Sequence, residues 1–460
     1  MGNKKNAWLK FDDTKKEEIF SFCEGYKKYI SDCKTERESI KEAISLAESK
    51  GYRDLKNVIS ARKSLKAGDK VYYNNMDKSL ALFLIGSESI ESGMRIIGSH
   101  VDSPRLDLKP NPLYEDSELS LMETHYYGGV KKYQWVTIPL ALHGVVVKKD
   151  GTKIDVVVGE EETDPVVMVS DLLVHLASEQ QQKKATEVIA GEDLNILVGS
   201  MPLKGEEKEA VKANILKLLK EKYDFEEEDF MSAEIEIVPA GKARDLGLDR
   251  SMVAGYGHDD RICAYTSLLA LLETESTKKT SVVLLVDKEE VGSIGATGMQ
   301  SRFFENAVAE LMDRVGEYSE LKLRRALANS KMLSSDVTAA FDPNYAGAYE
   351  KKNSAFFGKG LAFAKYTGAR GKSGCNDANA EFVAWLRNVM DENDVAYQMA
   401  ELGKVDQGGG GTIAYILAEY GMEVIDCGVA LQNMHAPWEV ASKVDIFETM
   451  RGYKAFLMAE

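Results

Sequence analysis

The chain has 460 residues, 44% of them hydrophobic, which is enough for two or three compact domains. Its 74 Asp and Glu residues outnumber its 58 Lys and Arg residues, and the formal net charge is −16. Such acidity argues against binding to nucleic acid or to anionic membranes, because both carry negative charge themselves. We therefore expect no nucleic acid and no membrane among the partners of this protein.

The sequence predicts a cytoplasmic protein. No apolar run reaches the roughly 20 residues that cross a bilayer, and the N-terminal segment MGNKKNAWLKFDD lacks the apolar core of a secretory signal. The five cysteines are scattered and form no C-x-x-C pair. They suit a reducing compartment and indicate neither a disulfide framework nor a thiolate zinc site.

Hydrophobic periodicity predicts the first elements. Apolar residues recur near helical spacing from Thr14 to about Lys50, which predicts one or two surface helices. Two short apolar stretches rich in branched residues, LALFLIGS after Ser79 and Met94–His100, predict buried strands.

A β-rich segment follows. Val136–Glu161 holds two β-branched runs around Asp150-Gly151, a dipeptide typical of a hairpin turn. The β-rich segment continues beyond Glu161 with two predicted amphipathic helices, one from Asp171 through Leu176 and one from about Glu206 to Lys222. A strand over Ala233–Ala240 ends it.

After Asp259, predicted strands alternate with predicted helices, beginning with the helix RICAYTSLLALLETE and the strand SVVLLVD. This alternation is typical of a mostly parallel sheet that helices cover on both faces. The predicted fold class is therefore α/β, with a mixed, mostly parallel sheet interrupted by an inserted β-rich domain. We assign residues 1–106 plus 246–460 to the first domain and residues 107–245 to the insertion.

Histidines and carboxylates stand at the ends of predicted strands, where open α/β sheets hold their ligands. In GSHVDSP, His100 and Asp102 alternate along a strand end, so their side chains leave on the same side. A histidine that binds a metal usually donates its second ring N–H to a partner such as a carboxylate, and Asp102 provides one. Taken alone, the pair is explained more simply as solvated or structural.

Two further segments add carboxylates. In GYGHDDRICA, Asp259 and Asp260 are adjacent before an apolar helix, and their repulsion calls for a nearby cation or N–H donors. Asp260 alone suits the N-cap of that helix. In SVVLLVDKEEVGSIGATG, the carboxylates of Asp287, Glu289 and Glu290 follow a buried strand. The glycines after them are spaced G-x-x-G-x-x-G and not G-x-G-x-x-G, so a nicotinamide-linked oxidoreductase is the weaker alternative.

Asp336 follows the apolar start of KMLSSDV, and His435 follows a late apolar stretch in ALQNMHAPWEV. Two histidines and three carboxylates suit two divalent metals that share one carboxylate. With a bridging hydroxide, these ligands neutralise two Zn²⁺ ions in a partly buried cleft. The metals would lower the pKa of the shared water from 15.7 toward ~7, and one of Glu289 and Glu290 is left to act as general base.

In their order along the chain and in their local sequences, these segments resemble the aspartyl aminopeptidase family of dinuclear zinc aminopeptidases. The chain resembles a bacterial member of that family. The resemblance spans nearly the whole chain and rests on GSHVDSPRLDLKP, Asp259-Asp260, EEVGS, SSDVTAAFDPNY and Met434-His435. It implies a zinc exopeptidase-like catalytic domain, an inserted dimerisation domain and a metalloaminopeptidase that removes N-terminal residues from peptide substrates.

The resemblance also implies the roles of single residues. His100, Asp259 and Asp336 would hold one metal ion. Asp259, as the bridging ligand, would hold the second ion together with Glu290 and His435. Asp102 would orient His100, and Glu289 would act as general base. The implied cofactor is two Zn²⁺ ions per subunit, although the same ligands accept Co or Mn.

In the family, dimers assemble into a tetrahedral dodecamer, and a histidine of the inserted domain reaches the site of a neighbouring subunit. The resemblance therefore implies a homo-oligomer, and the matching histidine is His175 in VSDLLVHLASEQ. The alternative is a histidine on the apolar side of an amphipathic helix. His258, beside Asp259, suits a structural role.

Two departures concern the substrate. Many relatives carry His-Pro-Asn-Tyr where this chain has Asp342-Pro343-Asn344-Tyr345, and the run Gly408–Gly411 before Thr412 is unusually rich in glycine. The run suits either a flexible loop before a helix capped by Thr412 or backbone N–H groups near the scissile carbonyl. The preferred N-terminal residue, whether acidic, neutral or basic, is open at this point.

Two other functions fit the same ligands. A dinuclear carboxypeptidase or amidohydrolase would need a cationic clamp for a carboxylate, and no motif identifies one. A catalytically silent, metal-stabilised scaffold would have no use for the spare base in Glu289-Glu290.

Overall fold

The computed structural model describes residues 5–460, which form two compact units. The first unit consists of the chain up to Asp102, Ala243–Met434 and Glu439–Glu460, and the second of Ser103–Lys242 and His435–Trp438. The chain therefore leaves the first unit twice. Among residues 5–460, no helix is both long enough and apolar enough to cross a membrane.

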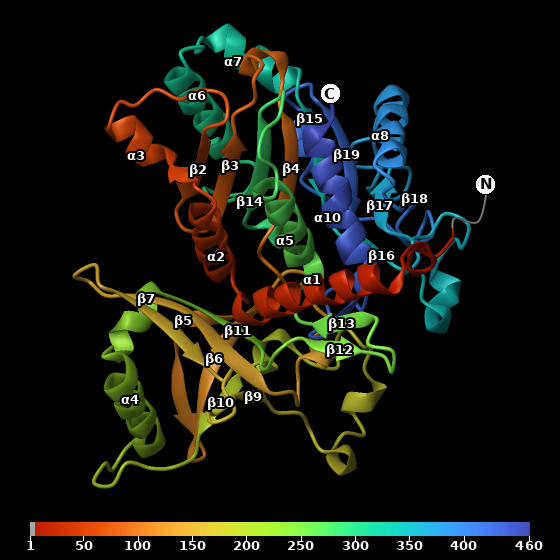
Figure 1. The fold of residues 1–460 in the computed structure, drawn as a ribbon. Coiled ribbons are helices and arrows are strands. Elements are labelled where there is room, and N and C mark those ends of the chain that lie inside the picture. The colour runs from red at the N-terminus through yellow and green to blue at the C-terminus, as the bar shows by residue number, and fades with distance from the viewer. Residues whose placement is uncertain (1–4) are drawn as a thin grey trace. The chain divides into compact units, whose positions relative to one another are not determined.

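The first unit is built on a sheet that has nine strands within residues 5–460 (Figure 1). Their order across the sheet is β1 (Arg53–Asp54), β2 (Lys70–Asn75), β3 (Ser79–Leu84), β14 (Ser281–Val286), β4 (Arg95–His100), β15 (Lys331–Ser335), β19 (Glu423–Gly428), β17 (Leu361–Ala364) and β18 (Tyr397–Met399). Five of the neighbouring pairs in this described sheet are parallel and three are antiparallel. The predicted α/β class with a mixed, mostly parallel sheet is confirmed.

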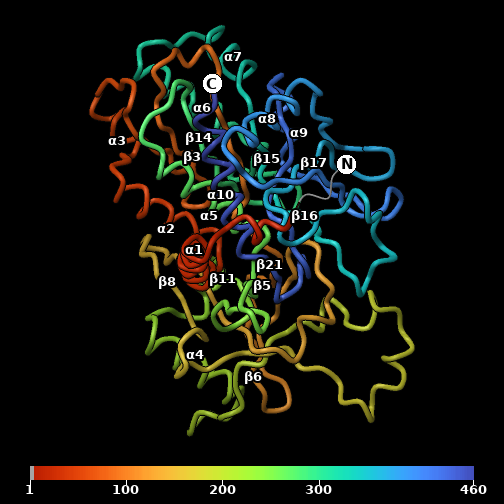
Figure 2. The backbone as a smooth tube through the Cα atoms, turned by 45° about the vertical axis from the view of Figure 1, so that its right-hand side comes forward, coloured from red at the N-terminus to blue at the C-terminus, as the bar shows by residue number. Residues whose placement is uncertain are grey.

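Helices cover both faces of this sheet, and the sequence of β14 shows why. Its side chains alternate, so Val283 and Leu285 face one apolar cluster while Val282 and Leu284 face another. The first cluster includes side chains of α2 (Glu36–Ser49), α5 (His258–Leu272), α8 (Ala380–Glu392) and α10 (Lys443–Met458). The second includes side chains of α3 (Leu55–Ser60), α6 (Phe303–Val315), α7 (Glu320–Ala328) and α9 (Ala414–Ala418). Figures 1 and 2 both show α5 and α10 side by side.

Two smaller parts complete the first unit. The N-terminal helix α1 (Asp13–Asp32) begins at Asp12, whose side chain accepts a hydrogen bond from the Lys15 N–H. A second sheet has five strands within the described residues, in the order β12 (Arg244–Leu246), β13 (Met252–Gly255), β21 (Glu439–Ser442), β20 (Ala430–Gln432) and β16 (Thr338–Ala339).

The second unit is an antiparallel sheet with one α-helix in its described residues, α4 (Ala210–Tyr223). The strand order is β8 (Lys153–Val158), β7 (Leu140–Val147), β11 (Ala233–Pro239), β5 (Arg105–Asp116), β6 (Leu119–Tyr127), β10 (Ile196–Gly199) and β9 (Met168–Val169). The predicted hairpin is present, since β7 and β8 pair across Asp150-Gly151 and the Lys148 N–H donates to the Thr152 carbonyl over 2.9 Å.

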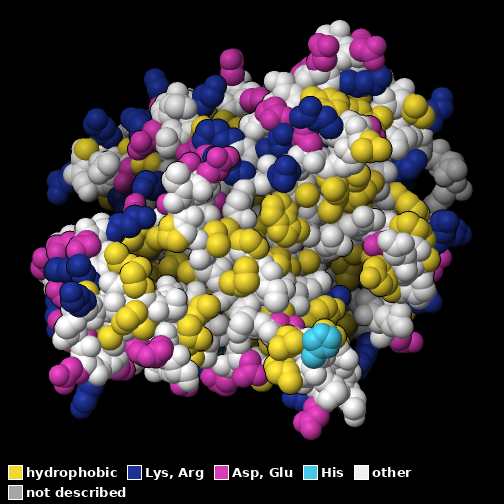
Figure 3. Space-filling model, turned by 90° about the horizontal axis from the view of Figure 1, so that it is seen from below, with side chains coloured by type: hydrophobic (Ala, Val, Ile, Leu, Met, Phe, Trp, Pro, Cys, Tyr) yellow, Lys and Arg dark blue, Asp and Glu magenta, His cyan; other side chains and the backbone are white. Residues whose placement is uncertain are grey.

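One predicted helix of the second unit is wrong. The segment from Asp171 to Leu176 forms only a short 3-10 turn over Val174–Leu176. Its apolar side chains are exposed, with 54% of Leu173 and 67% of Val174 accessible to solvent. A helix this short is stable only when its apolar stripe packs against a neighbour, and the described residues leave about half or more of each of these side chains uncovered. Figure 3 shows a face of the molecule on which hydrophobic side chains gather at the surface.

Candidate metal site

The candidate site of the first unit lies where three neighbouring strands end. The central strands β4, β14 and β15 are parallel, with Val286 of β14 opposite His100 and Ser334 of β15 opposite Gly98. The residues that follow these strands therefore meet at one edge of the sheet. This edge receives His100, the last residue of β4, and Asp102 after it, together with Glu289 and Glu290 after β14 and Asp336 after β15.

His100 stands at the centre of this group and is 2% exposed. Its Nδ1 lies 2.9 Å from the Asp102 carbonyl oxygen, which can only accept, so Nδ1 carries the proton. Nε2, on the other side of the ring, faces the carboxylates. Nε2 lies 3.2 Å from Asp259 Oδ1 and 3.9 Å from both Asp336 Oδ1 and Glu289 Oε2.

The Asp102 carboxylate connects the first strand end to the second. Its two oxygens accept the backbone N–H groups of Glu289, over 3.1 Å, and of Glu290, over 3.2 Å. It also lies 3.4 Å from His100 Nδ1, while the Asp102 carbonyl is the nearer acceptor of that ring nitrogen. Asp102 therefore fixes the backbone of the Glu-Glu segment as well as the imidazole.

Asp260 stands where the regular part of α5 begins, because the backbone at Asp259 and Asp260 is not helical, but its buried carboxylate does not cap that helix. Asp260 Oδ2 instead accepts the backbone N–H of His100 over 3.3 Å. The repulsion between the two adjacent aspartates is thus offset in part by an N–H donor of β4.

Burial and mutual repulsion disturb the ionisation of this group. Burial raises the pKa of the Asp260 carboxyl, and the nearby charges of Asp336 and Asp259 raise it further. The pKa of Asp336 is raised by burial and by Asp259, although His100 lowers it. For His100, burial lowers the pKa, but its hydrogen bonds to Asp102 and Asp259 raise it by more.

These residues fit a divalent cation. Two ligands of a tetrahedral zinc ion are about 3.4 Å apart, given metal–ligand distances of about 2.1 Å. The His100 Nε2 to Asp259 Oδ1 distance of 3.2 Å is close to this value. Among the described residues, ligand atoms of His100, Asp260 and Asp336, and likewise of His100, Glu289 and Glu290, lie within 4.8 Å of one another. A cation would also offset the repulsion that raises the two aspartate pKa values.

The two remaining site residues expected from the sequence, His175 and His435, belong to the second unit. His175 lies in the exposed 3-10 turn Val174–Leu176. The Nδ1 of His435 lies 2.9 Å from the Gly129 carbonyl oxygen, so this nitrogen carries the proton and Nε2 carries the lone pair. That tautomer suits a metal ligand that binds through Nε2.

Sequence reasoning missed Glu439, at the start of β21. It is 1% exposed, and its Oε2 accepts the Asp259 N–H over 3.1 Å. No motif marks this residue, because a glutamate at a strand end usually faces solvent. His258 is buried with its Nδ1 2.5 Å from the Tyr26 hydroxyl, and burial lowers its pKa to about 3, which agrees with a structural role.

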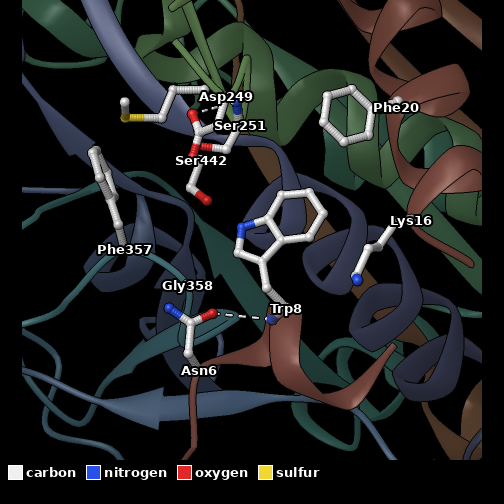
Figure 4. Close-up of a pocket in the computed structure, with 10 residues that line it drawn as sticks. Asn6, Trp8, Lys16, Phe20, Asp249, Ser251, Phe357, Gly358 and Ser442 are labelled. Atoms are coloured by element: carbon white, nitrogen blue, oxygen red, sulfur yellow. Dashed lines mark hydrogen bonds between the residues drawn. The ribbon is translucent and has the colours of Figure 1, made fainter. Parts of the chain in front are cut away.

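The first unit also has a cavity of about 460 Å³, which is separate from the histidine and carboxylate group (Figure 4). Trp8, Phe20, Met252 and Phe357 supply its apolar walls. It shares no lining residue with the histidine and carboxylate group, and the figure shows the Asn6 side chain directed to the Trp8 backbone. The chemistry of the candidate site therefore belongs to the sheet edge and not to this cavity.

Comparisons with known proteins agree with this fold. The probable M18 family aminopeptidase 1 of Clostridium acetobutylicum is 66% identical over 454 residues, which are 98% of each chain. The crystal structure of aminopeptidase I from the same organism matches with a TM-score of 0.93 at 64% identity over 99% of each chain. An M18 family aminopeptidase from Thermotoga maritima matches with a TM-score of 0.95 at 45% identity, also over 99% of each chain.

The fold and the site therefore define a zinc metalloaminopeptidase. The profile of the peptidase M18 family, aminopeptidase I zinc metalloprotease, matches residues 29–457. The chain belongs to the M18 family, which confirms the resemblance found in the sequence. It is a metal-dependent exopeptidase.

Removal of the metal tests the site directly. We expect 1,10-phenanthroline to abolish hydrolysis of an aminoacyl substrate and to lower the thermal unfolding midpoint, because the buried carboxylates lose the cation that offsets their repulsion. Added Zn²⁺ restores both. The non-chelating isomer 1,7-phenanthroline is the matched control. Full activity in protein shown by mass spectrometry to be metal-free would contradict the assignment.

Proposed function

We propose that the enzyme binds two divalent ions per subunit, most simply zinc, at the sheet edge. His100, Asp259 and Asp336 would hold one ion, and bridging Asp259, Glu290 and His435 the other. The observation that carries the proposal is the position of His100 Nε2, which has carboxylate oxygens from three other segments within 3.9 Å. Cobalt or manganese would accept the same ligands.

The assignment of His435 rests on its tautomer and on the chain around it. Its Nδ1 donates to the Gly129 carbonyl, so Nε2 is the nitrogen suited to a metal. The preceding residue, Met434, and Glu439, four positions later, both belong to the first unit. In the sequence, His435 therefore directly follows a residue of the unit that carries the other proposed ligands.

Glu289 is the proposed general base. Bound zinc would polarise the scissile carbonyl and acidify the attacking water. The Glu289 carboxylate takes one proton from that water as the water oxygen bonds to the carbonyl carbon. It then delivers this proton to the nitrogen of the scissile peptide bond as the C–N bond breaks. Its N–H is fixed by Asp102, and its side chain is 15% exposed, so it is held at the edge of the buried group.

Substitution of Glu289 by Gln tests this role. We expect kcat to fall about 100- to 10,000-fold while the zinc content is unchanged, because the amide cannot accept the proton. Glu320→Gln, on an exposed position of α7, is the matched control and leaves kcat unchanged. Near-normal turnover in Glu289→Gln, measured with a chromogenic aminoacyl substrate, would remove Glu289 from this role.

The proposed substrates are peptides with a free N-terminal amine, which acidic groups of the site would hold. N-acetylation removes the positive charge of that amine and should lower kcat/KM at least about 100-fold. Paired assays of free and N-acetylated peptides, each with Asp, Glu, Leu or Lys first, measure this effect and the preference for acidic, neutral or basic residues. Equal hydrolysis of both forms would favour an amidohydrolase acting on N-acyl amino acids.

We also propose that the inserted unit, residues 107–245, drives dimerisation within a tetrahedral dodecamer in the cytoplasm, and that His175 acts at a neighbouring subunit's site. The exposed Leu172, Leu173 and Leu176 around His175 support a surface that is covered on assembly. A Saccharomyces cerevisiae relative of similar fold, mApe1, was solved as a dodecamer; it is 20% identical, with a TM-score of 0.76 over 95% of this chain and 96% of its own.

Sedimentation velocity tests the assembly. We expect a species with the mass of the proposed dodecamer. Assembly would cover the apolar side chains that the second unit exposes. Activity should fall on dilution to the monomer if His175 completes a neighbouring site, and His175→Ala should lower kcat without changing the mass of the particle. A fully active monomer would contradict both proposals.

A further inference from the structure

Two loops at the end of the first unit's sheet, residues 366–377 and residues 403–412, are joined by their backbones. The first is a hairpin in which Ala369 and Ser373 exchange hydrogen bonds of 3.3 and 2.9 Å. The Gly368 N–H donates to the Gly410 carbonyl over 3.0 Å and so connects the hairpin to the second loop. We call these two segments together the loop pair.

The four glycines of the second loop are not equivalent. A Cβ at Gly408 would lie 1.8 Å from the Leu402 carbonyl oxygen, and one at Gly409, whose φ is +131°, would lie 2.3 Å from the Gly368 carbonyl oxygen. These two positions therefore require glycine for the close backbone approach. At Gly410 and Gly411 nothing lies within 4 Å of such a Cβ. Packing does not explain the second half of the run.

Side chains fix the loop pair to strand β19. The Thr412 hydroxyl donates to Asp426 Oδ1 over 2.5 Å and accepts the Ala414 N–H over 3.2 Å, so both of its hydrogen-bonding functions are used. In the hairpin, the Asn376 side-chain amide donates to the Val424 carbonyl over 2.7 Å. Asp426 itself is 3% exposed, and burial raises its pKa to about 6. A buried carboxylate retained at this cost has a role that an apolar residue does not fill.

The anchor stands beside the candidate metal site. Strand β19 is parallel to β15, with Asp426 opposite Ser334, two residues before Asp336. The Asp336 N–H donates to the Cys427 carbonyl over 2.8 Å. Ile413, which follows Thr412, approaches so near to Gly98 that a Cβ there would lie 3.0 Å from its Cδ1. The end of the glycine run is thus held at the strand ends that carry His100 and Asp336.

The exposed edge of this loop offers hydrogen-bond donors. Gly410 and Gly411 are exposed, and within residues 5–460 their N–H groups donate to no other residue. Because neither position carries a side chain, another backbone can approach them closely. A peptide supplies the matching groups, since its main-chain carbonyls only accept hydrogen bonds.

We propose that the Gly410 and Gly411 N–H groups bind main-chain carbonyls of the peptide substrate, and that Asp426 is a positioning residue that holds them in place through the Thr412 hydroxyl. This inference rests on the proposed peptide substrate. It assigns the loop pair to recognition of the substrate backbone, which every N-terminal sequence shares.

The test compares substitutions that remove a hydrogen bond with substitutions that keep it. Thr412→Val keeps the shape of the side chain but removes the hydroxyl, whereas Thr412→Ser keeps the hydroxyl. We expect Thr412→Val to raise KM for a tripeptide about tenfold with kcat within about twofold of wild type, and Thr412→Ser to behave as wild type. Zinc content and the unfolding midpoint, measured alongside, identify effects on the metal site or on folding.

A second pair tests the donors themselves. Gly411→Ala keeps the N–H, and Gly411→Pro removes it. We expect only the proline variant to raise KM about tenfold, and this pair decides the matter if Thr412→Val does not fold. Unchanged KM in Gly411→Pro, or zinc loss in Thr412→Val with unchanged KM, overturns the inference. Wild-type enzyme that hydrolyses no free peptide would instead overturn the proposed function, before any variant is compared.

Discussion

The crowding of carboxylates around one buried imidazole is the constraint on which the first unit depends. Asp259 and Asp260 are buried and Asp336 is partly buried, and the charges of Asp259 and Asp336 raise the cost of ionising their neighbours. Carboxylates in such a place must be protonated, hydrogen-bonded or paired with a cation. A divalent cation meets this need with the least rearrangement, because His100 Nε2 already faces the same oxygens. Metal binding and the integrity of the sheet edge are therefore linked.

The sheet supplies the rigidity that such a group requires. Strands β4, β14 and β15 are apolar on both faces, so helices on either side hold them and their ends cannot shift independently. Hydrogen bonds then cross from one strand end to the next. Asp102 holds the Glu289 and Glu290 backbone, and Asp260 holds the backbone of His100. The backbones of these proposed ligands are thus held before any cation binds, which lowers the cost of binding it.

Much of this arrangement could be predicted from the sequence. The apolar runs at β3, β4 and β14 are short and bounded by Gly or Ser, so strands and strand ends could be placed, and with them His100 and the Glu289-Glu290 pair. The 3-10 turn Val174–Leu176 could not be predicted, because an amphipathic pattern does not reveal whether the apolar side chains have a neighbour to pack against. The bond from Asp260 to β4 and the contact of Glu439 with Asp259 join residues more than 150 positions apart, which no local pattern records.

The chain leaves the first unit at two points that lie beside proposed site residues. Both excursions begin at strand ends that bear proposed site residues, after Asp102 and after Met434. A loop at the carboxyl edge of parallel strands, such as the one after β4, accepts insertions because no ladder hydrogen bond is broken there. An insertion so close to the site would disturb it unless the chain were held at its exit. At the first exit, the two N–H groups that bind the Asp102 carboxylate provide that hold, so the residue proposed to orient His100 also holds the chain between the proposed metal ligands and the segment that follows.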